Sequence, residues 1–236
     1  MAHNDLTIVT GASRGIGKGI AFRLAKEGHN LMLFGRDKFA LEQVKKEIRS
    51  FGIQSDMFLG DAADTKFVNE AVNQILKTYG RVDHLINNAG MGILKNFVDS
   101  NLDEFKKQID VNLYGVYNFT KAVIDHMIAN RSGSIINISS LAGKNAFIGG
   151  TMYSATKHAL MGFTKSLMLE VREYNIRVAA ICPGSVDTNF NMNRDLISEK
   201  KNILLSEDVA ETVALVLKMP IRAMVSEIDI RPTNPR

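Results

Sequence analysis

The sequence predicts a doubly wound α/β fold, in which one parallel β-sheet is covered by helices on both faces. Short runs that are apolar throughout alternate with longer amphipathic stretches along the whole chain. Strands without a polar face are typical of a parallel sheet that is buried on both sides. Right-handed crossovers between such strands place helices on both faces. The length of 236 residues suits a single domain, residues 1–236.

The expected strands are short, apolar and bounded by turn residues. In chain order they are Leu6–Thr10, Asn30–Phe34, Ser55–Leu59, His84–Asn87, Ser134–Ile138, Arg177–Cys182 and Ser226–Arg231. The stretches between them carry apolar residues three or four positions apart, which is the spacing of one helix face. These helices are expected at Gly15–Glu27, Phe39–Ser50, Thr65–Tyr79, Leu102–Asn130, Thr151–Tyr174 and Glu207–Lys218. Ligands of such folds bind beyond the carboxyl ends of the strands, so the residues that follow each strand are the candidates.

Composition excludes several other classes of protein. The net charge is +4, but Lys and Arg are spread along the chain without a basic run, so we expect no nucleic-acid partner. No apolar run is long enough to span a bilayer and the N-terminus has no signal-peptide pattern, so we expect no membrane contact and a cytoplasmic location. Cys182 is the single cysteine, which rules out an intrachain disulfide. The five histidines show no metal-ligand spacing, and we expect no metal.

A glycine-rich segment connects the first strand to the first helix. The residues Thr10–Gly17 read Thr-Gly-Ala-Ser-Arg-Gly-Ile-Gly. Glycines at 11, 15 and 17 let the backbone turn sharply and let a pyrophosphate approach the helix N-terminus, where N–H groups and the helix dipole favour anions. The spacing differs from Gly-x-Gly-x-x-Gly, and three glycines also occur in ordinary turns. The position after a strand and before an amphipathic helix favours a dinucleotide site of the Rossmann type.

The end of the second strand predicts the kind of nucleotide. NAD sites usually have an acidic residue there for the ribose hydroxyls, whereas NADP sites use Arg for the phosphate. Here Gly35 occupies the position expected for the acid, and Arg36 follows it. Together with Arg14 of the glycine segment, Arg36 can bind a phosphate dianion. The alternative is that Asp37 binds the ribose and that Arg36 is only a solvated surface charge.

Tyr153 and Lys157 lie four residues apart at the start of an expected helix and so face the same side. A nearby ammonium lowers the pKa of a phenol from about 10 toward neutral pH. A phenol of that kind suits a general acid that acts on a ketone. Such a pair is common on helices without any function, so its meaning depends on the residues around it.

These features together resemble the short-chain dehydrogenase/reductase family. The matching residues occur in the order of the family and span about the first four-fifths of the chain; they are Thr10–Gly17, Asp61, Asn87–Gly90, Asn112, Ser140, Tyr153, Lys157, Pro183, Gly184 and Thr188. Ser140 rather than Ser139 matches the catalytic serine of the family, because it lies 13 residues before Tyr153.

The resemblance implies a role for each matching residue. Tyr153 is the proton donor, Ser140 polarises the substrate oxygen, Lys157 binds the nicotinamide ribose, and Asn112 anchors a water that reprotonates Lys157. The residues expected to contact the cofactor are Gly11, Ser13, Arg14, Gly15, Ile16, Gly17, Arg36, Asp61, Ala62, Asn88, Ala89, Gly90, Tyr153, Lys157, Pro183, Gly184, Val186 and Thr188. A substrate lid is implied at about residues 188–204, and pairing of the long helices implies a homodimer or homotetramer.

The sequence therefore predicts an NADP(H)-dependent oxidoreductase, with NAD(H) as the alternative cofactor, that reduces a ketone or aldehyde. The chain resembles 3-oxoacyl-acyl-carrier-protein reductases, although the expected last strand Ser226–Arg231 lacks the Gly-Gly pair with which that branch usually ends. Two alternatives stay open. One is a dehydrogenase of a small polar hydroxy acid or sugar, and the other is a non-catalytic regulator that binds the nucleotide.

Overall fold

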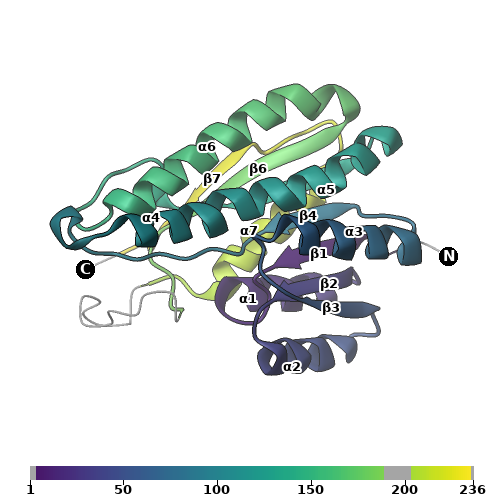
Figure 1. The fold of residues 1–236 in the computed structure, drawn as a ribbon. Helices are drawn as coiled ribbons and strands as arrows, with labels where there is room; N and C mark the ends of the chain where they lie inside the picture. Colours follow the sequence, from purple (N-terminus) through teal and green to yellow (C-terminus); the bar gives the residue numbers. More distant parts are fainter. Residues whose placement is uncertain (1–3, 189–202, 235–236) are drawn as a thin grey trace.

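A computed structural model describes residues 4–188 and 203–234 of the chain. These residues form a parallel sheet of seven strands in the order β3-β2-β1-β4-β5-β6-β7, with helices on both faces (Figure 1). The predicted doubly wound fold is thereby confirmed. Within the described ranges, no helix combines the length and the apolar character that crossing a membrane requires.

The strands and helices begin and end close to the predicted positions. The strands are β1 (Leu6–Thr10), β2 (Asn30–Gly35), β3 (Ser55–Leu59), β4 (His84–Asn87), β5 (Gly133–Ile138), β6 (Ile176–Pro183) and β7 (Glu227–Ile230). The helices are α1 (Gly15–Lys26), α2 (Lys38–Arg49), α3 (Thr65–Tyr79), α4 (Leu102–Ile109), α5 (Gly115–Asn130), α6 (Thr151–Val171) and α7 (Ser206–Lys218). Short 3-10 helices lie at Phe97–Asp99, Leu141–Gly143 and Arg172–Tyr174.

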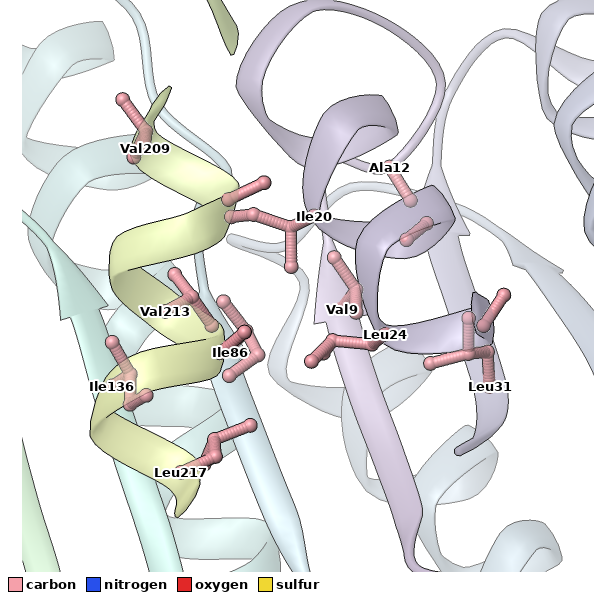
Figure 2. Packing of buried hydrophobic residues seen from close by; sticks show 14 of the residues in the cluster. Val9, Ala12, Ile20, Leu24, Leu31, Ile86, Ile136, Val209, Val213 and Leu217 are labelled. Atoms are coloured by element: carbon pink, nitrogen blue, oxygen red, sulfur yellow. The ribbon is translucent and has the colours of Figure 1, made fainter. Parts of the chain in front are cut away.

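Alternate residues of each strand point to opposite faces of the sheet, which gives the protein two hydrophobic cores. In β2, Leu31 and Leu33 belong to the core under α1 and α7, whereas Met32 and Phe34 belong to the core under α3 and α5. Figure 2 shows the first core, in which Ile20 and Leu24 of α1 lie beside residues of α7 over the central strands. Both faces are therefore covered, and this explains why the strands have no polar face in the sequence.

The predicted helix Leu102–Asn130 is interrupted, so the prediction of one continuous α-helix was wrong. A π-helical turn, Asp110–Tyr114, separates α4 from α5. Its central residue, Asn112, is completely buried. Apolar periodicity continues across the turn, so the sequence pattern could not show the extra residue that a π turn contains.

The order of the strands creates a crevice at one edge of the sheet. The chain proceeds outward from β1 through β2 to β3, then returns to place β4 on the other side of β1. Because all strands are parallel, their carboxyl ends and the loops that follow them gather at one end of the molecule (Figure 1). The crevice between the loops after β1 and β4 is where ligands of doubly wound sheets bind.

Candidate active site

A cavity of about 1000 Å³ opens at the carboxyl edge of the sheet, at the point where the strand order reverses. All residues predicted to form the site line it, except Gly17 and Asn112. The cavity extends from Arg36 and Asp61, after β2 and β3, to Ser140 and Tyr153, after β5 and on α6. The structure therefore brings together residues from most of the chain length around one space.

The glycine segment is held against the loop that follows β4. The Asn88 side-chain amide donates to the carbonyl oxygens of Thr10 at 2.9 Å and Gly11 at 3.2 Å. A Cβ at Gly17 would overlap the Gly11 carbonyl oxygen and lie 2.5 Å from Asn88 Nδ2. Gly17 is thus required for the close approach of α1 to the glycine segment, and Asn88 holds that segment through two hydrogen bonds.

The hydroxyl of Thr10 joins the two loops at the crevice. Its Oγ1 accepts hydrogen bonds from the backbone N–H groups of Asn88 and Ala89, both at 2.9 Å. The same hydroxyl donates to the carbonyl oxygen of Ile86 at 3.3 Å. These bonds hold the ends of β1 and β4 together where Thr10, Asn88 and Ala89 line the cavity.

The N-terminus of α1 is suited to an anion. Its N-cap residue, Arg14, is extended, with φ −159° and ψ 173°, and makes no side-chain cap. By contrast, α2, α3 and α4 are capped by the side chains of Asp37, Asp64 and Asn101. A helix start without a side-chain cap leaves backbone N–H groups for a bound oxyanion, whose charge the helix dipole also favours. The glycine segment and the start of α1 therefore fit the pyrophosphate of a dinucleotide.

Two arginines border the end of the cavity nearest β2. Arg36 is 70 % exposed and lies 3.5 Å from the Asp61 carboxylate, and Arg14 is also exposed. Both line the cavity, so both guanidinium groups lie within reach of a phosphate bound there. Asp37 lines the cavity too, but its carboxylate accepts from the Ala40 N–H at 3.0 Å and caps α2. Asp37 therefore has a structural role as the N-cap of α2, in addition to the ribose contact that the alternative prediction gave it.

Ser140, Tyr153 and Lys157 lie at the other end of the cavity. The Ser140 hydroxyl accepts from the Ala142 N–H at 3.1 Å, which fixes its position after β5. Tyr153 is in the first turn of α6 and forms a side-chain hydrogen bond with Ser140. Lys157 Nζ donates to the carbonyl oxygen of Ile138 at 3.0 Å and lies 5.9 Å from the centre of the Tyr153 ring.

The acid–base properties of this group differ from the sequence expectation. Burial raises the pKa of Tyr153 to about 12, and the hydrogen bond from Ser140 acts in the opposite direction. Burial also lowers the pKa of Lys157 to about 8. The expectation that Lys157 brings the phenol pKa down toward neutral pH was wrong for this geometry, because the loss of solvent dominates for both side chains. Tyr153 thus keeps its proton at neutral pH and can donate it.

Asn112 lies outside the cavity and supports the residues that line it. Its Oδ1 accepts from the Met91 N–H at 2.8 Å, and its Nδ2 donates to the Met91 carbonyl at 2.8 Å and to Thr156 Oγ1 at 3.0 Å. The amide therefore links the π turn, the loop after β4 and the helix that carries Tyr153. The water relay that the family resemblance implies for Asn112 stays a prediction.

The segment after β6 lies between the end of β7 and the glycine segment. Gly184 N–H donates to the Ile230 carbonyl at 2.8 Å, and a Cβ at Gly15 would lie 3.2 Å from Thr188 Cγ2. Val186 and Leu204 form an isolated parallel bridge. Of the lid predicted at about residues 188–204, only Thr188, Ile203 and Leu204 belong to the described residues; residues 189–202 lie outside them.

Several residues of the cavity wall were not predicted from the sequence. Leu94, Phe147, Ile203, Arg231 and Pro232 line the cavity but lie in loops without a recognisable spacing. A cluster of titratable side chains at the opposite end of the sheet was not predicted either. There the structure brings ligand-type atoms of Asp5, His29 and His84 within 4.8 Å of one another. No spacing in the sequence connects these three residues, because they come from the starts of three different strands.

Fold and site together first define a class, that of an α/β oxidoreductase with a dinucleotide-binding cleft. A family model described as short chain dehydrogenase matches residues 5–198, and the chain belongs to this family. An uncharacterized oxidoreductase of Staphylococcus aureus (strain MRSA252) is 34% identical over 229 residues, which is 97% of each chain.

Solved structures agree over nearly the whole chain. The alcohol dehydrogenase from the archaeon Thermococcus sibiricus, complexed with 5-hydroxy-NADP, is similar with a TM-score of 0.91 and 30% identity, over 98% of this chain and 97% of that one. A metagenomic short-chain oxidoreductase in complex with NADP has a TM-score of 0.86 and 34% identity, over the same shares of 98% and 97%. The predicted family is thereby confirmed.

Proposed function

We propose that the protein reduces a ketone or aldehyde to an alcohol with NADPH, and that a 3-oxoacyl compound is the substrate to test first. The observation that carries this proposal is the buried pair Ser140–Tyr153 beside Lys157, within a cavity that begins at two exposed arginines. A phenol with a pKa of about 12 keeps its proton at neutral pH, so Tyr153 is in the form that has a proton to give to a carbonyl oxygen.

In this mechanism the side chains act on the carbonyl oxygen. NADPH, when bound, supplies a hydride to the carbonyl carbon. The phenol of Tyr153 gives its proton to the oxygen and becomes a phenolate, so the C=O double bond becomes a C–O single bond with one new C–H and one new O–H bond. The Ser140 hydroxyl donates a hydrogen bond to the same oxygen and stabilises the negative charge that develops on it. Lys157 holds the ribose of the cofactor, as the resemblance to the family implies, and Asn112 keeps α6 in place against the loop after β4.

A preference for NADP(H) over NAD(H) is part of the proposal. It is supported by Arg14 and Arg36 at the cavity end nearest β2, and by the absence of an acidic side chain at Gly35. Asp37, the alternative ribose ligand, caps α2. Two similar solved structures were determined with NADP or an NADP derivative, which agrees with this reading.

We also propose that the protein assembles into a homodimer or homotetramer in the cytoplasm. Leu102, Tyr114, Tyr117 and Leu169 are exposed on α4, the π turn, α5 and α6. Apolar side chains gathered on neighbouring helices are typical of a face that a second copy covers.

The absorbance of reduced nicotinamide tests the activity. Purified protein should oxidise NADPH, and NADH far more slowly, in the presence of a panel that holds an acetoacetyl thioester, a 3-oxo ester, aldehydes, diketones and keto sugars. Faster turnover with NADH would contradict the cofactor assignment. Nucleotide binding without turnover of any carbonyl compound would favour the non-catalytic regulator.

The pKa of Lys157 predicts how NADPH binding depends on pH. Burial places this pKa at about 8, so the ammonium loses its proton as the pH rises through that value. The dissociation constant for NADPH, measured by nucleotide fluorescence, should therefore rise about tenfold between pH 7 and 9.5, since a hydrogen bond from a charged donor is lost. Lys157→Met should bind NADPH weakly across the same range without a step near pH 8. A step that persists in Lys157→Met would assign it to another group.

A further inference from the structure

Four exposed apolar side chains lie on two neighbouring loops, and one of them, Phe147, lines the cavity. Phe97, Val98, Phe147 and Ile148, called here the apolar rim, are 69%, 87%, 45% and 94% exposed. Phe97 and Val98 lie in the loop between β4 and α4, and the other two lie in the loop between β5 and α6. Single exposed apolar residues are ordinary, but a group of large ones beside a cavity indicates a binding surface.

The two loops are joined by their backbones. Lys95 N–H donates to the Gly149 carbonyl at 2.9 Å, and Gly150 N–H donates to the Phe147 carbonyl at 3.1 Å. The second bond closes a tight turn with Ile148 and Gly149 at its corners, and Gly149 has φ +79°, which the third position of such a turn can require. The turn therefore holds Ile148 out at the surface, next to the loop that carries Phe97 and Val98. Both loops lie at the same end of the molecule (Figure 1).

The apolar rim is continuous with the catalytic end of the cavity. Leu94 in one loop and Phe147 in the other line the cavity itself. The Phe147 ring rests on Gly150, where a Cβ would lie 2.5 Å from a ring carbon. Gly150 is the N-cap of α6, and Tyr153 follows in the first turn of that helix. Phe147 thus lies between the start of the helix that carries Tyr153 and the more exposed residues of the apolar rim.

Charges at this end of the cavity do not favour an anionic substrate. Lys95 pairs with Glu104 at 2.6 Å, and Arg231 pairs with Asp229 at 3.2 Å. Lys144 forms ion pairs with the carboxylates of Glu227 and Asp229. Each of these three basic side chains already has a carboxylate partner, although Lys144 and Arg231 share Asp229, so a carboxylate or phosphate on the substrate would compete with existing ion pairs.

We propose that the apolar rim binds the aliphatic tail of the carbonyl substrate, so that the preferred substrates carry an unbranched chain rather than a sugar or a small charged acid. This inference rests on the proposed function, since it assigns the tail of the compound whose carbonyl Tyr153 protonates. The carbonyl group lies at Ser140 and Tyr153, and the tail passes Leu94 and Phe147 to reach Val98 and Ile148.

A chain-length series tests the rim. Ethyl 3-oxoalkanoates with acyl chains of four, six, eight and ten carbons are reduced with NADPH, and kcat/KM is compared. We expect kcat/KM to rise about fourfold for each methylene that becomes buried, until the rim is covered. A value of kcat/KM that stays level or falls with chain length would overturn the proposal.

A double variant shows whether the rim causes the rise. Val98→Ser with Ile148→Ser should lower the ratio of kcat/KM for the ten-carbon over the four-carbon ester by at least about tenfold. The control is Ile221→Ser, which changes an apolar residue that is 69% exposed at the opposite end of the sheet and should keep the wild-type ratio. If the double variant keeps that ratio but changes the sedimentation coefficient, the rim is a contact between subunits and the proposal is wrong.

Binding without reaction separates this proposal from the proposed function. Calorimetric titration of the ten-carbon and four-carbon esters into the wild type and the double variant needs no turnover. Preferential binding of the longer ester that the double variant loses would support the rim even if no ester is reduced, in which case only the proposed reduction would be wrong. If all esters are reduced and the four-carbon and ten-carbon esters bind equally well, the proposed reduction is supported and the proposed role of the apolar rim is wrong.

Discussion

Tyr153→Phe should lower kcat for carbonyl reduction by about a hundred- to ten-thousand-fold, the range that a positioned general acid contributes. The phenylalanine keeps the ring that is buried against the cavity wall but removes the O–H that would protonate the substrate oxygen. Ser140 still offers its hydroxyl to that oxygen, so some stabilisation of the developing charge remains. The dissociation constant for NADPH should change little, because the phosphate contacts lie at the other end of the cavity.

The control for this variant is Tyr174→Phe, which removes the same hydroxyl from a tyrosine in the 3-10 helix after α6. Tyr174 does not line the cavity within the described residues, and its variant should match the wild type in kcat. If Tyr153→Phe retained a tenth or more of wild-type kcat, Tyr153 would not be the proton donor. The search for another donor would then begin with Ser140.

Arg36→Ala should raise the KM for NADPH by about ten- to hundredfold and leave the KM for NADH within about twofold. The variant loses a charge-assisted contact to the phosphate. It also releases the Asp61 carboxylate, which is paired with Arg36 at 3.5 Å, and a free carboxylate at that position repels a dianion. NADH lacks the phosphate and is insensitive to both changes.

Two nearby substitutions make the Arg36 result specific. Lys38→Ala removes an exposed cation two residues away that does not line the cavity among the described residues, and it should leave both KM values unchanged. Asp37→Ala should lower the free energy of unfolding by about 1 kcal/mol through loss of the α2 cap, without changing the preference for NADPH. A selective rise in the KM for NADH in Asp37→Ala would instead identify Asp37 as the ribose ligand.

The sequence predicted the fold and most of the cavity because the relevant signals are local. Each strand is an apolar run, and in a parallel sheet the residues after every strand meet at one edge. Gly11, Arg36, Asn88 and Ser140 could therefore be grouped without knowledge of any contact. The family resemblance added residues such as Thr188, which no periodic pattern identifies.

Features that depend on the loss of solvent or on packing between distant segments could not be predicted from the sequence. Spacing places Lys157 one turn after Tyr153, but it does not show that both side chains lose their solvent, and that loss reversed the expected direction of the Tyr153 pKa. Phe147 and Ile148 lie beside Phe97 and Val98 because the backbone N–H of Lys95 binds the turn that carries Phe147 and Ile148. The order of residues along a loop contains no information about that neighbour.

The π turn at Asp110–Tyr114 also determines which neighbours the two halves of this long helical stretch contact. One extra residue rotates everything after it by about 100° around the helix axis relative to an uninterrupted α-helix. Accordingly, α4 packs against α6, which carries Tyr153, whereas α5 packs against α3. A single inserted residue thus lets α4 pack against α6 while α5 packs against α3. Loss of one residue from the π turn would realign α4 with α5 and turn the Asn112 side chain away from Met91 and Thr156. In evolution, tolerance to insertion and deletion should therefore be low at this point, although the segment looks like an ordinary helix.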